Sequence, residues 1–349
     1  MILNAKTIGT PSPKVEEIDI PGGDGVLDLT EAFGETKYKN RKLSFEFSTI
    51  APKSQFSDVF SRVQNLLHGR RMDIRLSDDA GWYYTGRVSV NEWKADKAVG
   101  RFTVDCDCEP YKQKVSDTTI LHRFSGKNLF NCAAPQLATA YNTSVTSLST
   151  GVRITSLSPG QWRFAQFKIA PIKMLAGLTI TCSYKAAATT GAAERVGLGY
   201  FKSPYNPLSI VAYSTASSHT VSLKIDAKQA ETFDSVGLWL YSSRDVDGTA
   251  NAYVDYTDVQ VEIGNVATAF AAYDSTTKTA VLTATNSRKT VIPLIMATAP
   301  ATVTKDGFTA SIAADAENRI PEFEMKEGNH VFTVSGSGLF AIQYREGSL

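Results

Sequence analysis

The sequence contains no long apolar run and no strong excess of charge of either sign. No stretch approaches the roughly 20 apolar residues that a membrane-spanning helix needs, and the first residues, MILNAKTIG, lack the apolar core of a signal peptide. Thirty-six Lys and Arg residues against 35 Asp and Glu residues give a net charge of +1. Such a balance gives no support to non-specific nucleic-acid binding, which needs a basic surface. We therefore expect no export signal, no membrane segment and no nucleic-acid partner.

Motifs of known hydrolases are also missing. Neither G-x-S-x-G nor H-E-x-x-H occurs, and the four histidines show no paired spacing. A glycosidase needs two carboxylates across a cleft, whereas Asp226, Glu231 and Asp234 follow one another in what has the composition of a surface turn. We expect a protein that is not an enzyme and has no catalytic residues.

Cysteine is scarce, with four residues in 349. Cys106 and Cys108 form C-x-C on a predicted strand and so share one face. A zinc site would need a second well-spaced pair, which is absent. We expect buried free thiols in Cys106, Cys108, Cys132 and Cys182, without a disulfide framework and without a metal site.

What the sequence does contain is strand-like alternation, interrupted by one helix. Residues 81–112 alternate polar and apolar residues on both sides of a polar turn, which is typical of a long hairpin. Residues 42–47 (KLSFEF) alternate in the same way. Between them, residues 54–68 (SQFSDVFSRVQNLLH) carry a single apolar stripe at helical spacing. Residues 1–111 therefore predict an α+β domain with one helix against a twisted antiparallel sheet.

The composition changes between residues 126 and 273, where Ala, Ser and Thr increase and short strands follow one another without a clear helix. Gly and Pro separate these strands at the spacing expected of a sandwich or jelly roll. The whole chain is thus predicted to be mainly β. The strands expected here span residues 152–154, 162–169, 178–183, 196–200, 209–213, 220–225, 236–241 and 253–263.

Four segments carry a family resemblance. Residues 21–47 (PGGDGVLDLTEAFGETKYKNRKLSFEF), 65–88 and 106–112 (CDCEPYK) resemble the N-terminal domain of siphophage distal tail proteins, also called Dit or baseplate hub proteins. Residues 326–349 resemble the closing strands of the galectin-like β-sandwich domain of that family. The resemblance implies three parts: a ring-forming domain at 1–111, a galectin-like domain made of 112–125 and 274–349, and an insertion at 126–273.

The resemblance also implies an assembly. Members of this family form a homo-hexamer, a ring at the distal end of the phage tail, between the tail tube protein and the tail-associated hub protein. The expected location is therefore the virion tail tip, after synthesis in the host cytoplasm. A ring joins two different surfaces of each protomer, and aromatic residues are enriched at interface cores. Trp82, Tyr84 and Trp93 are our candidates for that interface, although alternation requires some of the hairpin's aromatics to face their own sheet.

The insertion resembles the carbohydrate-binding jelly rolls of the longer, "evolved" distal tail proteins and of glycoside hydrolases, through residues 128–136, 151–169 and 254–270. This resemblance implies binding of host cell-wall polysaccharide. Sugar rings stack on aromatic planes, and their hydroxyls need polar partners. The candidate residues are Trp162, Tyr200, Phe201, Tyr205, Trp239 and Tyr241, with Arg163, Asn206, Arg244 and Asp245 as polar partners. Trp162 and Trp239 fit either the core or the groove.

Two alternatives stay open. Asp255, Asp258 and Glu262 would suit a structural calcium ion, or they are unpaired surface acids; we expect no cofactor. The insertion could also be a purely structural module that contacts neighbouring subunits, and a cell-wall glycosidase is a more distant possibility.

Overall fold

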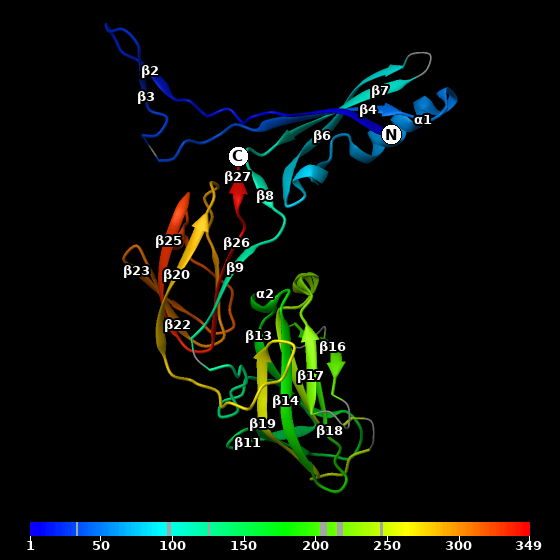
Figure 1. The fold of residues 1–349 in the computed structure, drawn as a ribbon, viewed down its shortest axis with the longest axis vertical. Helices are drawn as coiled ribbons and strands as arrows, with labels where there is room; N and C mark the ends of the chain where they lie inside the picture. Colours follow the sequence, from blue (N-terminus) through cyan, green and yellow to red (C-terminus); the bar gives the residue numbers. More distant parts are fainter. Residues whose placement is uncertain (33, 96–98, 125, 203–207, 215–218, 245–246) are drawn as a thin grey trace.

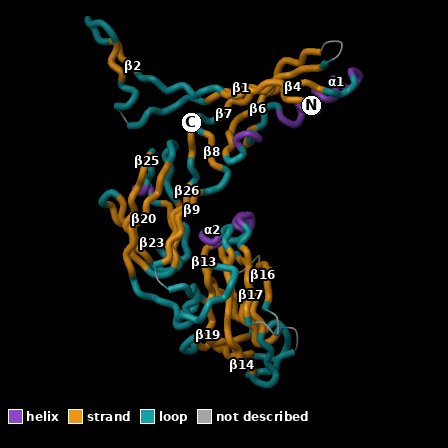
Figure 2. Tube along the Cα trace, viewed as in Figure 1, coloured by secondary structure: helices purple, strands orange, loops and turns teal. Residues whose placement is uncertain are grey.

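The computed structural model consists largely of β-strands (Figures 1 and 2), which confirms the mainly-β prediction. It describes all residues except 33, 96–98, 125, 203–207, 215–218 and 245–246. In this described part the longest helix, α1 (Phe56–Leu67), has 12 residues, so no helix there could span a membrane. The strands form three structural units.

The N-terminal unit is a sheet in the order β1-β4-β7-β6-β8-β27, with β5 paired to β6. The predicted hairpin is present as β6 and β7, and the predicted helix is present as α1, whose apolar stripe packs on the sheet through Val63. Gly86 is required on β6, because a Cβ there would lie 2.5 Å from Cys108 Sγ on β7. The strands are β1 (Ile2–Ile8), β4 (Arg41–Thr49), β5 (Arg71–Ile74), β6 (Trp82–Ala95), β7 (Gly100–Cys108), β8 (Lys112–Lys114) and β27 (Gly347–Ser348).

The hairpin aromatics are mostly occupied within this unit. Tyr84 is buried in the sheet's own core, so its prediction as an interface anchor is wrong: alternation turns it inward between Tyr83 and Thr85. Trp93 is half-buried against α1, with its ring centroid 5.0 Å from that of Phe60. Trp82 is half-buried beneath Lys112, whose Nζ lies 5.1 Å from the ring centroid.

Beyond β1 and β4 the chain continues as a long two-stranded ribbon, which we call the arm (residues 9–40). It ends in a hairpin of β2 (Glu17–Asp19) and β3 (Val26–Asp28) that projects away from the sheet (Figure 1). Backbone hydrogen bonds join its strands: the Gly9 amide donates to the Lys42 carbonyl, and the Lys39 amide donates to the Ser12 carbonyl.

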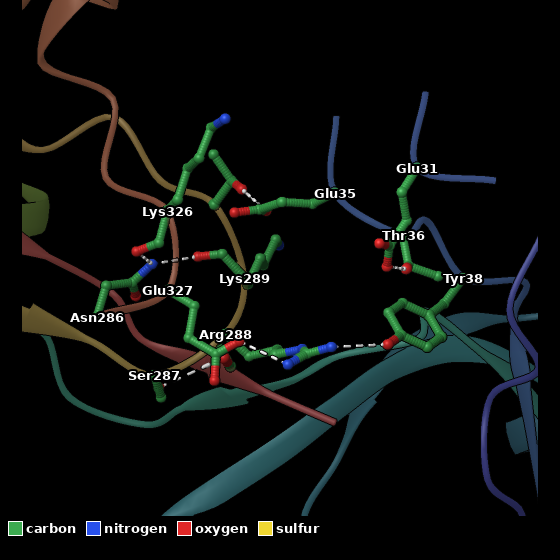
Figure 3. A network of polar contacts seen from close by, with 12 residues as sticks. Glu31, Glu35, Thr36, Tyr38, Asn286, Ser287, Arg288, Lys289, Lys326 and Glu327 are labelled. Carbon is green, nitrogen blue, oxygen red and sulfur yellow. Dashed lines mark hydrogen bonds and ion pairs between the residues drawn. The ribbon is translucent and has the colours of Figure 1, made fainter. Parts of the chain in front are cut away.

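The base of the arm is held in place by the C-terminal sandwich. Figure 3 shows Arg288 donating to the Tyr38 hydroxyl at 2.9 Å and pairing with Glu327 at 2.6 Å. Thr290 donates to Glu35 at 3.2 Å. The Tyr38 ring also meets Tyr111 edge to face, with centroids 6.0 Å apart. These contacts fix the direction in which the arm leaves the molecule.

The C-terminal sandwich pairs two four-stranded sheets, β20-β25-β22-β23 and β24-β21-β26-β9. The chain's last strand, β27, leaves this sandwich and pairs with β8, and so continues the sheet of the N-terminal unit. The strands are β9 (Thr118–Arg123), β20 (Lys278–Asn286), β21 (Leu294–Ala297), β22 (Ala301–Lys305), β23 (Phe308–Ile312), β24 (Asn318–Arg319), β25 (Gly328–Gly336) and β26 (Leu339–Tyr344).

The inserted sandwich lies between β9 and β20. The chain enters and leaves it at one place: a Cβ on Gly126 would lie 3.2 Å from Asp274 Cβ, and Asn128 donates a hydrogen bond of 3.2 Å to the Ala271 carbonyl. Its two five-stranded sheets run β10-β13-β18-β15-β16 and β11-β12-β19-β14-β17. All eight predicted strands are present, with ends that match the prediction or differ from it by up to five residues, and β10, β11 and the one-turn helix α2 are additional. The elements are β10 (Leu137–Tyr141), β11 (Thr143–Ser147), β12 (Val152–Ser156), β13 (Arg163–Pro171), α2 (Ile172–Leu175), β14 (Thr179–Ala188), β15 (Arg195–Phe201), β16 (Leu208–Tyr213), β17 (Thr220–Lys224), β18 (Ser235–Ser243) and β19 (Tyr253–Ile263).

The two central strands of one sheet of the C-terminal sandwich, β21 and β26, are buried on both faces. Side chains of β21 and β26 that point one way, such as Ile342, join the core of their own sandwich. Those that point the other way, Leu294, Met296, Leu339 and Ala341, join the core of the inserted sandwich. Polar contacts border this joint: Lys173 pairs with Glu317 at 2.6 Å, and Gln136 donates to the Thr298 carbonyl at 3.2 Å. The insertion is therefore packed against its host sandwich rather than tethered to it.

The cysteines are buried and free, as the sequence predicts. Burial raises the pKa of the Cys182 thiol to about 12, so this thiol stays protonated and unreactive at neutral pH.

Substitution at the joint tests this packing. Leu339→Ala should lower the free energy of unfolding by about 2–5 kcal/mol, as for other fully buried leucines. It should also speed amide exchange in α2 and β13, measured by hydrogen-exchange mass spectrometry, because its side chain packs against the insertion. Ile342→Ala, on the same strand but facing the other core, is the matched control. Equal acceleration of α2 and β13 in both variants would contradict the two-faced burial.

Glu346 ties the N-terminal unit to the C-terminal sandwich. It accepts hydrogen bonds from Lys114 at 2.7 Å and Thr118 at 2.6 Å. Burial alone would raise the pKa of Glu346, but these hydrogen bonds outweigh it and hold the pKa below the ordinary value of 4.5. A lowered folded-state pKa stabilises the fold above the unfolded-state pKa, and this stabilisation is lost as the pH falls through the folded-state pKa.

Glu346→Gln should therefore lower the free energy of unfolding at pH 7 by about 1–3 kcal/mol. The difference from wild type should shrink as the pH falls below 4.5 towards the lowered pKa of Glu346, because the wild-type carboxyl is then protonated as well. Urea denaturation at pH 7 and pH 3 measures both values. Glu327→Gln, which removes a half-exposed pair with Arg288, should change stability by less than about 1 kcal/mol at either pH. If Glu346→Gln lowered the free energy of unfolding equally at pH 7 and pH 3, the stabilising role of the charged carboxylate would be contradicted.

Candidate functional site

The strongest candidate site lies on the outer face of the sheet β10-β13-β18-β15-β16, the side turned away from the core of the inserted sandwich. Strand alternation separates the two faces. Ala165, Phe167, Leu238 and Leu240 point into the core. Their neighbours Phe164, Trp239 and Tyr241 join Phe201 in a second cluster on the other side. We call this second cluster, with Gln166, the aromatic face.

Trp239 lies at the centre of the aromatic face. Its ring meets that of Phe201 edge to face, with centroids 6.2 Å apart. Glycine makes room for it, because a Cβ on Gly237 would lie 2.8 Å from the Trp239 ring. Gly197 on β15 is the register partner of Trp239. It has no side chain, so Ile210 packs in the space that a Cβ would occupy. Gly237 thus leaves space for the Trp239 indole, and Gly197 leaves space for Ile210.

Buried polar atoms accompany these rings. Gln166 pairs in register with Trp239, and both side chains are fully buried. Within the described part of the chain, the Gln166 amide nitrogen and oxygen and the Trp239 indole nitrogen have no hydrogen-bond partner. Leaving such groups unsatisfied costs about 1–3 kcal/mol each. Most buried polar groups in native proteins are paired, so Gln166 and Trp239 depart from the usual pattern within the described part of the chain.

Trp162 stands at the exposed rim of this face. It adopts a left-handed backbone (φ 59°), unusual for tryptophan, and 47% of the residue is exposed. One of its neighbours is Tyr241, with ring centroids 6.5 Å apart. The Arg244 guanidinium lies over two rings, 5.1 Å from the Trp162 centroid and 4.0 Å from that of Tyr213. This arrangement places a flat apolar ring and a cation side by side at the surface.

A second exposed ring extends the rim. Tyr141, on β10, is 49% exposed and stacks on Phe164 with centroids 5.6 Å apart and an interplanar angle of 20°. Phe164 in turn contacts Tyr241, at 5.3 Å. A continuous series of ring contacts therefore links Tyr141 to Trp162 through the buried part of the aromatic face.

Several residues predicted to stack on sugars are buried instead. Tyr200 points into the core, where its hydroxyl donates to the Lys224 carbonyl at 3.3 Å, so its prediction is wrong. Phe201, Trp239 and Tyr241 lie on the aromatic face, but each is at most 3% exposed and offers no free ring surface. The error has one cause: alternation identifies a strand's two faces but not what covers them.

The predicted polar partners divide in a similar way. Arg163 donates to the backbone carbonyls of Ser158, Pro159 and Gln161, so it fixes the preceding loop rather than facing a ligand. Arg244 is half-buried at the rim. Tyr205, Asn206 and Asp245 lie outside the described residues.

Sequence reasoning missed three members of this site: Tyr141, Gln166 and Tyr213. Gln166 alternates with two buried apolar residues, which is a recognisable signal for the opposite face. Tyr141 lies on a strand of small residues (LATAY) that the sequence did not predict.

The acids considered for calcium each have a protein partner. Asp255 accepts a bidentate pair of hydrogen bonds from Arg153, at 2.6 and 2.8 Å, and Asp258 pairs with Lys185 at 2.8 Å. Glu262 accepts from the Thr268 amide, Thr268 hydroxyl and Gln260 amide, and these bonds outweigh burial and lower its pKa. They are therefore paired, contrary to the reading as unpaired acids. No cluster of three or more potential metal ligands occurs in the described part of the chain.

Comparison with solved structures gives distant likenesses, of which two are described here. No family model and no curated protein sequence matches the chain. Among solved structures, the phage SPP1 Dit protein (gp 19.1), described as a paradigm of the hub adsorption apparatus in phages that infect Gram-positive hosts, is 13% identical. That match has a TM-score of 0.30 and covers 74% of this chain and 93% of that one. A mutant xylanase 10C from Cellvibrio japonicus, in complex with xylopentaose, is also 13% identical; its TM-score is 0.26, with 42% of this chain and 29% of that one covered. TM-scores this low carry no inference about function.

The unpartnered amide of Gln166 makes a stability prediction. Gln166→Leu should raise the free energy of unfolding of the ligand-free protein by about 1–3 kcal/mol, because it removes an unsatisfied buried amide and keeps most of the volume. Gln260→Leu is the matched control: this glutamine is equally buried, but it donates to Glu262 and accepts from Ala271, so its loss should destabilise. Urea denaturation measures both. A loss of stability in Gln166→Leu comparable to that of Gln260→Leu would show that the Gln166 amide is satisfied.

Proposed function

We propose that this chain is a structural protein of a siphophage tail tip, a distal tail protein, whose inserted sandwich binds host cell-wall polysaccharide. In this proposal six copies form a ring between the tail tube protein and the tail-associated hub protein. The ring would lie at the distal end of the tail in the virion, after synthesis in the host cytoplasm. Support comes from the resemblance of residues 21–47, 65–88, 106–112 and 326–349 to that family. It also comes from the chain's organisation, with an insertion that leaves and rejoins a β-sandwich at one point.

The rim of the aromatic face carries the carbohydrate part of the proposal. Pyranose rings present C–H faces that pack on aromatic planes, and Trp162 and Tyr141 offer such planes at the surface. Arg244, stacked beside Trp162, supplies N–H donors that match sugar hydroxyls or the carboxylates and phosphates of acidic wall polymers. The single observation behind this assignment is the exposed Trp162 ring, held by its backbone conformation next to that cation.

Assembly would turn a weak site into a strong one. One shallow site with two exposed rings fits weak binding. Six copies around one axis would engage a repeating polymer together, and avidity exceeds single-site affinity by about 10²–10⁴ when the geometry allows it. The packed joint at β21 and β26 would fix the orientation of each site relative to the ring.

The joint also favours the principal alternative, a purely structural role for the insertion. A module packed this tightly on its host sandwich is suited to bracing a neighbouring subunit as well as to presenting a ligand site. A cell-wall glycosidase is the more distant alternative, and we propose that the chain is not an enzyme. Asp226 caps a short turn by accepting from the Lys228 amide at 3.0 Å, and Asp234 accepts from the Ser235 hydroxyl at 2.8 Å. Each carboxylate thus has a local structural role.

Sedimentation with cell walls tests the proposal. The full-length protein should co-sediment with protein-free walls of a Gram-positive panel, and periodate oxidation of the wall glycans should abolish this. Trp162→Ala should weaken retention by about tenfold or more, equivalent to roughly 1.4 kcal/mol per site. Tyr253→Ala removes a different aromatic ring stacked under an arginine, Arg153, on the opposite sheet, and should leave retention unchanged.

Three results would decide against parts of this proposal. Retention that survives periodate would refute carbohydrate recognition, and equal loss in Trp162→Ala and Tyr253→Ala would refute the assigned face. Release of soluble reducing sugars from the walls would show an enzyme.

A further inference from the structure

Two corners of the inserted sandwich meet at the rim of the aromatic face. The chain crosses from one sheet to the other through Asn142, between β10 and β11, and again through residues 157–162, between β12 and β13. The Leu157 amide donates to the Asn142 carbonyl at 2.9 Å, which joins the two corners. Each corner holds a left-handed residue other than glycine, Asn142 with φ 50° and Trp162 with φ 59°. This conformation is unusual for a residue as large as tryptophan, and backbone strain of this kind concentrates at functional sites.

Three exposed apolar side chains gather at these corners, and we call them the platform: Tyr141, Leu157 and Trp162. They are 49%, 60% and 47% exposed. Tyr141 stacks on Phe164, whereas Trp162 contacts Tyr241. Within the described residues, no ring contact joins Tyr141 to Trp162 directly. Each exposed ring therefore rests on a different buried ring, and the platform offers two separate stacking planes.

The platform lies at the end of the insertion that is far from the joint. Trp162 precedes β13, and the other end of β13 leads into α2. The Lys173–Glu317 pair holds α2 beside the C-terminal sandwich (Figure 1). The nine residues of β13 separate the platform from α2 by about 30 Å, at about 3.3 Å per residue. A long ligand can therefore reach the platform without meeting the C-terminal sandwich.

The loop that carries Trp162 is fixed from two sides. Arg163 donates to the Ser158 carbonyl at 3.0 Å and to the Gln161 carbonyl at 2.7 Å. Gly160 gives the guanidinium room, because a Cβ there would lie 2.7 Å from Arg163 Nη2. Gly160 also exchanges two backbone hydrogen bonds with Gly248, at 3.0 and 3.1 Å. A loop that is already ordered loses little conformational entropy on binding, so these contacts favour affinity.

An open platform and an enclosed pocket recognise different parts of a polymer. Ligand pockets bury most of the surface of what they bind, and a pocket of that kind suits the end of a sugar chain. Tyr141 and Trp162 are half-exposed, so a chain stacked on them keeps its other side in solvent. Such a chain can continue past the site in both directions. The two planes can then contact two sugar residues of the same chain.

We propose that the platform binds an internal stretch of one linear polysaccharide chain, with separate sugar residues stacked on Trp162 and on Tyr141. In this inference Arg163 is a positioning residue that holds Trp162 in place for the contact. The inference rests on the proposed function, because it takes the ligand to be the wall polysaccharide bound by the insertion. It adds how the chain is recognised. Internal recognition gives every repeat of a polymer an equivalent site, which suits binding by several copies at once.

Inhibition of wall retention tests internal recognition. Polysaccharide released from the retaining walls is used whole, or after partial acid hydrolysis to hexasaccharides, as a competitor for the full-length protein. At equal mass the whole polysaccharide should inhibit at least as well as the hexasaccharides, because internal stretches are equally plentiful in both. A site for chain ends would make the whole polysaccharide weaker in proportion to its length, and that result overturns the proposal.

The two planes are tested by chain length. Monosaccharides from complete hydrolysis can cover only one plane, whereas hexasaccharides can reach both. The ratio of their half-inhibitory concentrations should fall about tenfold in Tyr141→Ala, equivalent to roughly 1.4 kcal/mol. Tyr253→Ala, which removes a ring on the opposite sheet, should leave the ratio unchanged. An unchanged ratio in Tyr141→Ala overturns the second plane.

Arg163→Lys tests the positioning role. Lysine keeps the charge but lacks the planar set of donors that reaches several carbonyls of the loop. The half-inhibitory concentration of hexasaccharide should rise at least about threefold in this variant. Arg153→Lys is the matched control, since it breaks a bidentate pair with Asp255 on the opposite sheet. A variant that is less stable to urea but inhibited at the wild-type concentration would show that Arg163 serves the fold alone.

The outcomes separate this inference from the proposed function. Absence of retention on any wall rejects the proposed function itself. Retention that depends on Trp162 but is inhibited through chain ends, or is indifferent to Tyr141→Ala, keeps the proposed function and rejects this inference. If Trp162→Ala and Tyr141→Ala instead weaken self-association in sedimentation velocity and leave retention intact, the platform is a contact between protein subunits, and the inference is rejected.

Discussion

Burial of two central strands of one sheet on both of their faces is the constraint on which the rest of this structure depends. Most strands here follow the ordinary rule for antiparallel sheets, with one apolar side and one polar side. The strand β21 (LIMA) and the first four residues of β26 (LFAI) are apolar on both sides, and every residue of both strands is buried. One side completes the C-terminal sandwich and the other completes the inserted one. Each large aliphatic side chain at this joint contributes roughly 1.5–3 kcal/mol to keeping the two units together.

This rigidity determines what the aromatic face can do. A ligand site on a loosely tethered module would sample many orientations, whereas a site on a packed module keeps one direction relative to the N-terminal sheet and its arm. In the proposed function, each site would therefore keep one binding direction relative to the N-terminal sheet. The buried rings behind Trp162 serve the same end, because they hold the exposed indole and the Arg244 guanidinium in one geometry.

The sequence predicts the secondary structure well because the signals for it are local. An apolar stripe at helical spacing locates α1. Alternation and turn residues locate the β6–β7 hairpin and eight strands of the inserted sandwich. The candidate site was predicted less well because exposure is a property of tertiary packing. Three predicted aromatic residues do lie on the aromatic face, but packing across that face buries them: Trp239, Phe201 and Tyr241. Tyr141 was missed because a strand of small residues carries little signal. The joint was not predicted, because the short apolar segments of β21 and β26 do not reveal what lies against them.

The single crossing point at Gly126 and Asp274 has an evolutionary consequence. A segment whose two ends meet can in principle be exchanged between proteins by one recombination event at each end, without disturbing the strands that flank it. The doubly buried sheet restricts which replacements succeed. A newly acquired segment must have an apolar surface that covers Leu294, Met296 and Leu339. A protein that lost the segment altogether would first need polar residues at those three positions. The polarity of the residues at these three positions therefore indicates whether a related protein carries, or once carried, an inserted segment.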